Sequence, residues 1–206
     1  MNNIYEDSRN QIHPTAIISP FAKIGVGNII CAYAVINDDV EIGDNNEIGS
    51  FTVIGGKGEI RNGKNYKGKV KIGSRNLINH HVTIDQPLTG YTVVGNDNFI
   101  MTKSHIGHDV VISNNVTISS GANIGGHTMV FDHATIGLNA EIHQRKIIGS
   151  GAMIGMGASI TKNVRPFSKV VGVNKVIGFN DYKVKELDIS TEQLFLLISH
   201  FMQDFE

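Results

Sequence analysis

Aliphatic residues, most of them isoleucine, recur every six residues along most of this chain. An amphipathic helix has a period of 3.6 residues and a half-buried strand a period of 2, so the pattern fits neither. A six-residue period is typical of a β-helix, in which each hexad supplies one short strand and one corner and three hexads close a triangular coil. Positions 18 residues apart then lie above one another, about 4.8 Å apart. The first series is Ile12, Ile18, Ile24, Ile30, Ile36, Ile42, Ile48, Ile54 and Ile60, then Ile72, Ile78 and Ile84.

The second series runs from Val94 to Ile160. We therefore predict an all-β fold, a parallel β-helix over residues 11–180. Where the count fails, at residues 61–71 and 85–93, we expect loops that leave the coil. A Ser190–Gln193 capping pattern before apolar residues at helical spacing predicts an amphipathic helix in a C-terminal appendage, residues 181–206.

Charge and cysteine content exclude several classes of protein. The 18 Lys and Arg residues nearly balance the 19 Asp and Glu residues, which disfavours nucleic acid as a partner. Cys31 is the single cysteine, so no intrachain disulfide and no cysteine-based zinc site can form. The N-terminus resembles no signal peptide and no long apolar run follows, so we expect a cytoplasmic protein without membrane insertion.

The first expected loop is basic. Seven cations between Lys57 and Arg75 face the single anion Glu59. Lys64 and Lys67 are therefore candidate contacts for an anionic substrate, although a solvated loop explains the same charges.

Histidines gather along one predicted edge of the coil. His108, Gly126 and Gln144 are 18 residues apart and form one column, with His127 and His143 as sequence neighbours. An imidazole can remove a proton from a nucleophile near neutral pH, and an unobstructed glycine N–H can stabilise an oxyanion, so this column is suited to acyl transfer. Asp109 can orient His108 only at a corner, because adjacent residues in a strand point to opposite faces.

Two other interpretations of the histidines stay open. They can be surface residues of a repeat scaffold. Alternatively, His105, His108 and His127 can converge on a metal ion, as in the carbonic anhydrases built on this solenoid.

Three motifs carry a resemblance to a known family. Ser104-His105-Ile106-Gly107-His108-Asp109, then Gly125-Gly126-His127, then Ile142-His143-Gln144 resemble the corresponding run in the bacterial UDP-N-acetylglucosamine O-acyltransferases of lipid A synthesis. The similarity extends over roughly residues 11–180. It implies a left-handed coil and a homotrimer with active sites between subunits.

The resemblance also implies roles for individual residues. His108 matches the general base, Asp109 its partner, and Gly126 the oxyanion amide. Met156, twelve positions after Gln144, matches the residue that closes the acyl groove, where methionine favours a short or medium chain. The residues that match substrate contacts are His105, His127, His143, Gln144 and Asn180.

The expected function is transfer of a short or medium acyl group from a coenzyme A or acyl carrier protein thioester to a hydroxyl or amine of a nucleotide-linked sugar. No metal and no permanently bound cofactor are expected. The family has a multi-helix C-terminal domain, whereas this sequence ends one helix past the repeat, which favours a sugar other than the lipid A precursor. The alternatives are a lipid A-type O-acyltransferase, a γ-type carbonic anhydrase and a non-catalytic scaffold.

Overall fold

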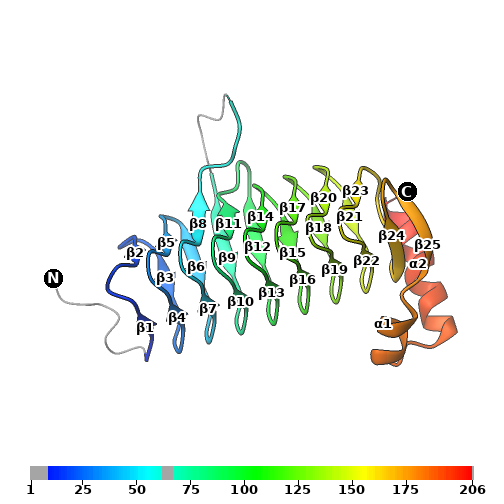
Figure 1. The fold of residues 1–206 in the computed structure, drawn as a ribbon, viewed down its shortest axis with the longest axis horizontal. Coiled ribbons are helices and arrows are strands. Elements are labelled where there is room, and N and C mark those ends of the chain that lie inside the picture. Colours follow the sequence, from blue (N-terminus) through cyan, green and yellow to red (C-terminus); the bar gives the residue numbers. More distant parts are fainter. Residues whose placement is uncertain (1–8, 62–66, 206) are drawn as a thin grey trace.

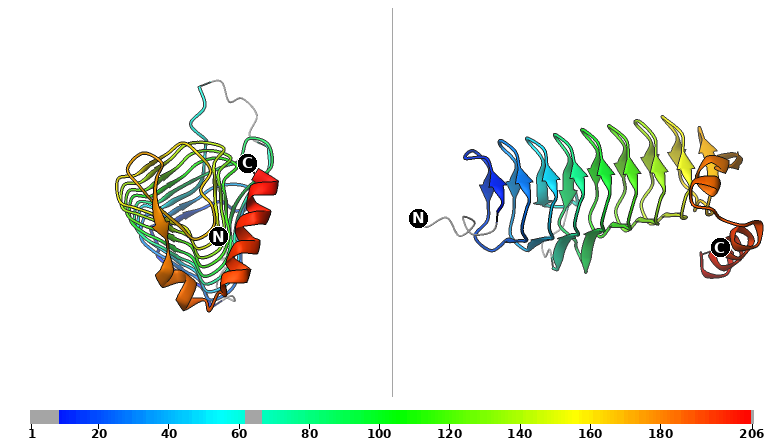
Figure 2. Two further views of the ribbon diagram at one scale, coloured as in Figure 1. Left: turned by 90° about the vertical axis from the view of Figure 1, so that its right-hand side faces the viewer. Right: turned by 90° about the horizontal axis from the view of Figure 1, so that it is seen from below.

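The computed structural model describes residues 9–61 and 67–205 as a parallel β-helix followed by two short helices (Figure 1). Seen along its axis the coil is triangular, with one sheet on each side (Figure 2). The expected all-β, left-handed β-helix is confirmed. Among the described residues, no helix is long and apolar enough to cross a membrane.

Each coil contributes one strand to each of three sheets, which we call sheets A, B and C. Sheet A contains β1 (Gln11–Ile12), β4 (Ile29–Ile30), β7 (Glu47–Ile48), β10 (Leu77–Ile78), β13 (Phe99–Ile100), β16 (Thr117–Ile118), β19 (Thr135–Ile136), β22 (Met153–Ile154), β24 (Ser168–Val171) and β25 (Lys175–Phe179). Sheet B contains β2 (Ile17–Ile18), β5 (Val35–Ile36), β8 (Val53–Gly56), β11 (Thr83–Asp85), β14 (His105–Ile106), β17 (Asn123–Ile124), β20 (Glu141–Ile142) and β23 (Ser159–Ile160). Sheet C contains β3 (Lys23–Ile24), β6 (Val40–Ile42), β9 (Lys69–Ile72), β12 (Tyr91–Val94), β15 (Val111–Ile112), β18 (Met129–Val130) and β21 (Ile147–Ile148).

The six-residue period produces the core directly. Ile100 pairs with Ile118 and Ile118 with Ile136, so each isoleucine stacks on the one 18 residues later. These side chains are fully buried inside the triangle. Ile60 is the exception in the predicted series, because it is 39% exposed and lies in a loop rather than in the ladder.

Both loops end earlier than expected, and the first also begins earlier, because β8 ends at Gly56. Residues 69–72 form β9 and residues 91–94 form β12, so both return to sheet C before the predicted loop ends are reached. The β11 strand also extends to Asp85. The count fails there because the loops add residues to a coil without altering its three strands: Val53 pairs with Thr83, 30 residues later, and Thr83 with His105, 22 residues later.

A ladder of buried asparagines lines the corner between sheets C and A. The side-chain carbonyl of Asn46 accepts hydrogen bonds from both the backbone and the side-chain nitrogen of Asn76, at 2.9 Å each. Asn76 Nδ2 also donates to the Gly95 carbonyl, and Asn76 Oδ1 accepts from the Asn98 backbone. The ladder satisfies polar groups that would otherwise be buried without partners.

The C-terminal appendage contains two helices, α1 (Asp181–Glu186) and α2 (Thr191–Phe205). The expected capping box is present: Gln193 N–H donates to Ser190 Oγ, and Ser190 N–H donates to Gln193 Oε1. Phe201 is buried, and α2 lies along one side of the triangle (Figure 2). The sequence pattern did not predict α1. The β-helix itself ends before residue 180, because β24 and β25 form an antiparallel hairpin.

Candidate functional site

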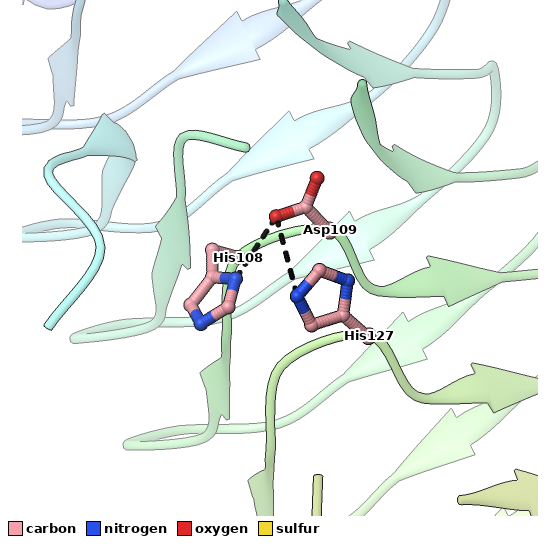
Figure 3. A group of neighbouring side chains, drawn as sticks. All are labelled: His108, Asp109 and His127. Atoms are coloured by element: carbon pink, nitrogen blue, oxygen red, sulfur yellow. Dashed lines mark hydrogen bonds and ion pairs between the residues drawn. The ribbon is translucent and has the colours of Figure 1, made fainter. Parts of the chain in front are cut away.

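His108 and Asp109 form a hydrogen-bonded dyad at the corner between sheets B and C (Figure 3). Asp109 adopts a left-handed backbone conformation, with φ of 58°. This turn lets two adjacent side chains meet, which an extended strand would prevent. The distance from His108 Nδ1 to Asp109 Oδ2 is 2.9 Å, and both side chains are largely buried.

The second loop fixes the Asp109 carboxylate. Leu88 N–H donates to one carboxylate oxygen, and Thr89 N–H and the Thr89 hydroxyl both donate to the other. Burial by itself raises the pKa of Asp109, but the hydrogen bonds from Leu88, His108 and Thr89 outweigh it and lower the pKa to about 2. The carboxylate is therefore ionised at neutral pH and can only accept protons in hydrogen bonds.

Because Asp109 only accepts, His108 carries its proton on Nδ1 and leaves Nε2 with a free lone pair when the ring is neutral. The ring lies against Gly126 of the next coil. A Cβ at position 126 would come within 2.6 Å of both Cε1 and Nε2 of His108, so only glycine fits there.

The Gly126 N–H has no hydrogen-bond acceptor within the described part of the chain. A Cβ at Gly107 would lie 3.0 Å from the Gly126 nitrogen, so a second glycine keeps this donor uncovered. A basic nitrogen and an unused N–H thus lie near each other, as general-base catalysis with oxyanion stabilisation requires.

His127 is the third member of the group drawn in Figure 3. Its ring packs edge-on against His108, with centroids 4.9 Å apart, and its Nε2 is 4.0 Å from Asp109 Oδ2. Burial lowers the pKa of His127, and the neighbouring Arg145 and His108 lower it further against the opposing effect of Asp109. We therefore expect a neutral His127 at pH 7.

His105 lies on β14 and belongs to a separate group with Thr83 and Asp85. Its Nδ1 is 2.8 Å from Thr83 Oγ1, and its Nε2 is 3.8 Å from Asp85 Oδ2. Burial, with a smaller contribution from Glu59, raises the pKa of Asp85 to about 6 against the lowering effect of His105.

His143 and Gln144 lie at the same corner one coil beyond Gly126. The Arg145 N–H donates to the Gly126 carbonyl, just as the His127 N–H donates to the His108 carbonyl, so the predicted column runs along this corner. His143 and Gln144 are exposed. Their assignment as substrate contacts stays a prediction.

The other predicted substrate contacts lie elsewhere. Met156 and Leu138 stack at the corner between sheets A and B, where the Gly157 N–H donates to the Leu138 carbonyl, and Met156 is 76% exposed. Within one chain this corner is not that of His108. A role for Met156 in the acyl groove therefore requires a second subunit.

Asn180 is buried and caps α1. Its Nδ2 donates to the Gly151 carbonyl and its Oδ1 accepts from the Lys183 N–H. These bonds explain the residue without a ligand, and the predicted nucleotide-sugar contact stays untested. Lys64 lies outside the described residues, and Lys67 is exposed.

The loop that begins after β8 and the second loop meet close to the dyad. A Cβ at Gly68 would lie 1.7 Å from the Gly90 carbonyl oxygen, and a Cβ at Gly58 would lie 3.1 Å from His108 Cβ. Sequence reasoning missed the roles of Thr89 and Asp85. An acidic residue at the end of a repeat strand, next to the buried Ile84, was an available signal for Asp85.

His108, Asp109 and His127 also satisfy the spacing of a metal site, because one ligand atom of each lies within 4.8 Å of the others. This set differs from the predicted alternative, in which His105 took the place of Asp109. Both Asp109 oxygens already accept two hydrogen bonds each, and His108 Nδ1 donates one of them. A metal would have to displace these bonds, so the donor set fits the dyad better than an ion.

A cavity of about 370 Å³ lies at the C-terminal end of the molecule, between the last coil, the β24–β25 hairpin and α2. Its lining includes Lys162, Arg165, Val176 and Ile198 and none of the histidines. It is thus separate from the histidine corner.

The fold is a coil of six-residue repeats that carries the histidine corner, and comparison with known proteins finds similar chains. The protein-family model of the bacterial transferase hexapeptide (six repeats) matches residues 21–56 and 91–126 of the chain. The chain resembles the UDP-N-acetylglucosamine O-acyltransferases in particular. It is 37% identical over 128 residues to the acyl-[acyl-carrier-protein]–UDP-N-acetylglucosamine O-acyltransferase of Thermodesulfovibrio yellowstonii. The aligned region covers 51% of this chain and 49% of the relative.

Solved structures show the same similarity. The UDP-N-acetylglucosamine O-acyltransferase from Moraxella catarrhalis superposes with a TM-score of 0.83 at 25% identity, covering 94% of this chain and 84% of that one. The UDP-N-acetylglucosamine acyltransferase from Campylobacter jejuni gives 0.79 at 26% identity, covering 93% and 83%. The chain spans about half the length of the curated relatives it matches.

Proposed function

We propose that this protein transfers an acyl group from a thioester of coenzyme A or acyl carrier protein to a hydroxyl or amine of a nucleotide-linked sugar. The observation that carries the proposal is the His108–Asp109 dyad, whose ring lies against Gly126 of the next coil. The relatives named as UDP-N-acetylglucosamine O-acyltransferases support the class of reaction.

Each residue of the histidine corner has a separate role in the proposed reaction. His108 Nε2 takes the proton of the attacking hydroxyl or amine while Asp109 stabilises the imidazolium through Nδ1–H. The Gly126 N–H stabilises the oxyanion that forms on the thioester carbonyl. When the C–S bond breaks, the thiolate leaves with the proton that His108 held.

The remaining predicted residues surround this centre. His105, His127, His143 and Gln144 contact the substrates, and Lys64 and Lys67 attract the pyrophosphate of the nucleotide. Asn180 stays a candidate nucleotide-sugar contact. The protein works as a homotrimer, because the exposed corner needs a second wall to enclose a nucleotide sugar. Sedimentation of a stable, fully active monomer would contradict this assembly.

A substrate panel tests the proposed function. Acetyl, butyryl and decanoyl thioesters of coenzyme A and acyl carrier protein are combined with UDP- and dTDP-linked sugars, and free thiol release and product mass are measured. We expect one nucleotide sugar to gain one acyl group. Absence of any acylated sugar, together with indifference of the protein to loss of His108, would instead favour a scaffold.

The metal-dependent alternative has its own test. A γ-type carbonic anhydrase holds a metal ion at stoichiometric occupancy, so elemental analysis of the purified protein separates the two functions. We expect acyl transfer to survive exhaustive chelation.

A further inference from the structure

Asp85 occupies an unusual position at the end of β11. The register between β11 and β8 shifts after Ile84, so that Asp85 comes opposite Gly56. The Asp85 side chain is 8% exposed, and on the following coil it faces His105. A buried carboxylate requires hydrogen-bond donors or a positive charge beside it, because burying an unpaired charge is costly in free energy.

Among the residues that the structure describes, the partners of Asp85 leave part of its hydrogen-bonding capacity unused. His105 Nε2 is 3.8 Å away, within ion-pair range but beyond hydrogen-bond length. The His105 ring is held from its other side by Thr83 at 2.8 Å. The Glu59 N–H supplies a backbone hydrogen bond. A carboxylate offers about four acceptor sites, so a further donor can bind.

The surroundings of Asp85 favour a positively charged donor. Burial, and to a smaller extent the negative charge of the Glu59 carboxylate, holds the pKa of Asp85 near 6. Asp109, the other carboxylate of the corner, already accepts four hydrogen bonds. Asp85 is therefore the carboxylate that gains most from a cationic ligand.

Asp85 also lies close to the proposed base. Its charge interacts with that of His108 as well as with that of His105. The loop segment that supplies Glu59 reaches His108 as well, since a Cβ at Gly58 would lie 3.1 Å from His108 Cβ. A group bound at Asp85 therefore lies in the neighbourhood of His108.

We propose that the acceptor is an amine, and that Asp85 binds the ammonium group of a nucleotide-linked amino sugar beside His108. This inference rests on the proposed function and narrows it to N-acylation. An ammonium offers three donors and a charge, whereas a hydroxyl offers one neutral donor, and charged hydrogen bonds are about twice as strong as neutral ones.

The reaction balances with the groups present. His108 Nε2 takes one proton from the ammonium, and the freed lone pair forms the C–N bond to the thioester carbonyl. The Gly126 N–H stabilises the oxyanion. The C–S bond then breaks and the thiolate takes the proton from His108. A second proton leaves the nitrogen for solvent, which gives a neutral amide and a free thiol.

Binding without a thioester tests the inference independently of catalysis. UDP-N-acetylglucosamine is compared with analogues in which the hydroxyl at position 3, 4 or 6 of the ring is replaced by an amine, using calorimetry on the intact protein. For wild type we expect one amine analogue to bind at least about tenfold more tightly than the hydroxyl compound. Equal or weaker binding of all three amines overturns the inference.

Variants assign the preference to Asp85. Asp85→Asn should lower the ratio of amine to hydroxyl affinity by roughly 10- to 100-fold, the range for hydrogen bonds to charged groups. Glu59→Gln should lower the same ratio by roughly threefold. Asp97→Asn, the same change at an exposed carboxylate paired with Arg75, should leave the ratio unchanged. An unchanged ratio in Asp85→Asn overturns the inference, whatever the effect of Glu59→Gln.

Product analysis separates this inference from the proposed function. Acylation of UDP-N-acetylglucosamine in preference to every amine analogue would leave acyl transfer standing and overturn amine selection. Tight, Asp85-dependent amine binding with no transfer from any thioester would support amine recognition and contradict acyl transfer.

Discussion

Thr89, in the second loop, donates two hydrogen bonds to the Asp109 carboxylate of the dyad. Its hydroxyl and backbone N–H both reach one oxygen of Asp109 at 3.0 Å. The rest of that carboxylate is held by Leu88 and His108. Thr89 therefore acts as a positioning residue, since it touches the group that orients the base.

Thr89→Val tests this role because it removes the hydroxyl and keeps the shape. We expect kcat to fall by roughly tenfold, with little change in KM, since one hydrogen bond to a charged group is lost. The His108 Nδ1–H proton signal in NMR should shift at the same time. Thr89→Ser retains the hydroxyl and should restore both quantities. Wild-type kcat and an unmoved signal in Thr89→Val would contradict the role.

Asp85 makes stability depend on pH. Burial holds its pKa near 6, above its ordinary value near 4, so the folded state favours the neutral form. The contribution of Asp85 to stability is fully present below about pH 4 and is lost as pH rises through 6. Asp85→Asn stays neutral, and we expect it to be about 3 kcal/mol more stable than wild type at pH 8 and nearly equal at pH 4. Urea unfolding at both pH values measures this, and equal differences at the two would contradict it.

At the residue scale, the 18-residue length of one coil was enough to predict from the sequence that His108 lies beside Gly126. That count holds because no loop interrupts the coils between them. It could not place Asp85 and Thr89 against the histidines, because the loops that precede and contain them break the count. The hydrogen bond from the Lys183 N–H to Asn180 depends on α1, which the sequence pattern did not indicate.

At the scale of the element, the asparagine ladder holds the corner between sheets C and A. Asn76 is 2% exposed and makes hydrogen bonds to the coils on both sides. Its loss would leave the buried Asn98 N–H and the Gly95 carbonyl without partners.

We expect Asn76→Ala to lower the free energy of unfolding by about 3 kcal/mol, because each unsatisfied buried group costs about 1 to 3 kcal/mol. Asn123→Ala is the matched control, since its side chain bonds to Gly121 and Glu141 at the surface. The control should lose under about 1 kcal/mol. Similar losses in chemical denaturation of the two variants would show that the ladder has no special role.

The strands were the most predictable elements, because the aliphatic period fixes both their positions and their inward face. Ile60 shows the limit of that period: it keeps the count by coincidence inside a loop and is exposed. The ends of both loops were misplaced because a strand can resume with Val70 or Thr92 inside, residues that the isoleucine count does not include. The α2 cap was recognisable because Ser190 and Gln193 bond to each other locally.

At the scale of the whole molecule, Met156 and the dyad lie at different corners of one triangle. For Met156 to close the acyl groove, the proposed homotrimer has to place Met156 of one subunit beside the dyad of another. Methionine then fills space that glycine leaves empty, and each buried methylene contributes about 0.8 kcal/mol to binding. We expect Met156→Gly to move the preferred acyl group to a longer chain, as read from kcat/KM for a ladder of thioesters. The same chain-length profile in both proteins would remove Met156 from the groove.

Loss of His108 tests the central claim most directly. With the preferred nucleotide sugar and thioester, thiol release by His108→Ala is compared with that of wild type after both show the same circular dichroism and assembly. The His108 ring is outside the isoleucine ladder, so folding should be unchanged. General-base catalysis predicts a fall in turnover of roughly 10² to 10⁴-fold, and turnover close to that of wild type would contradict the account.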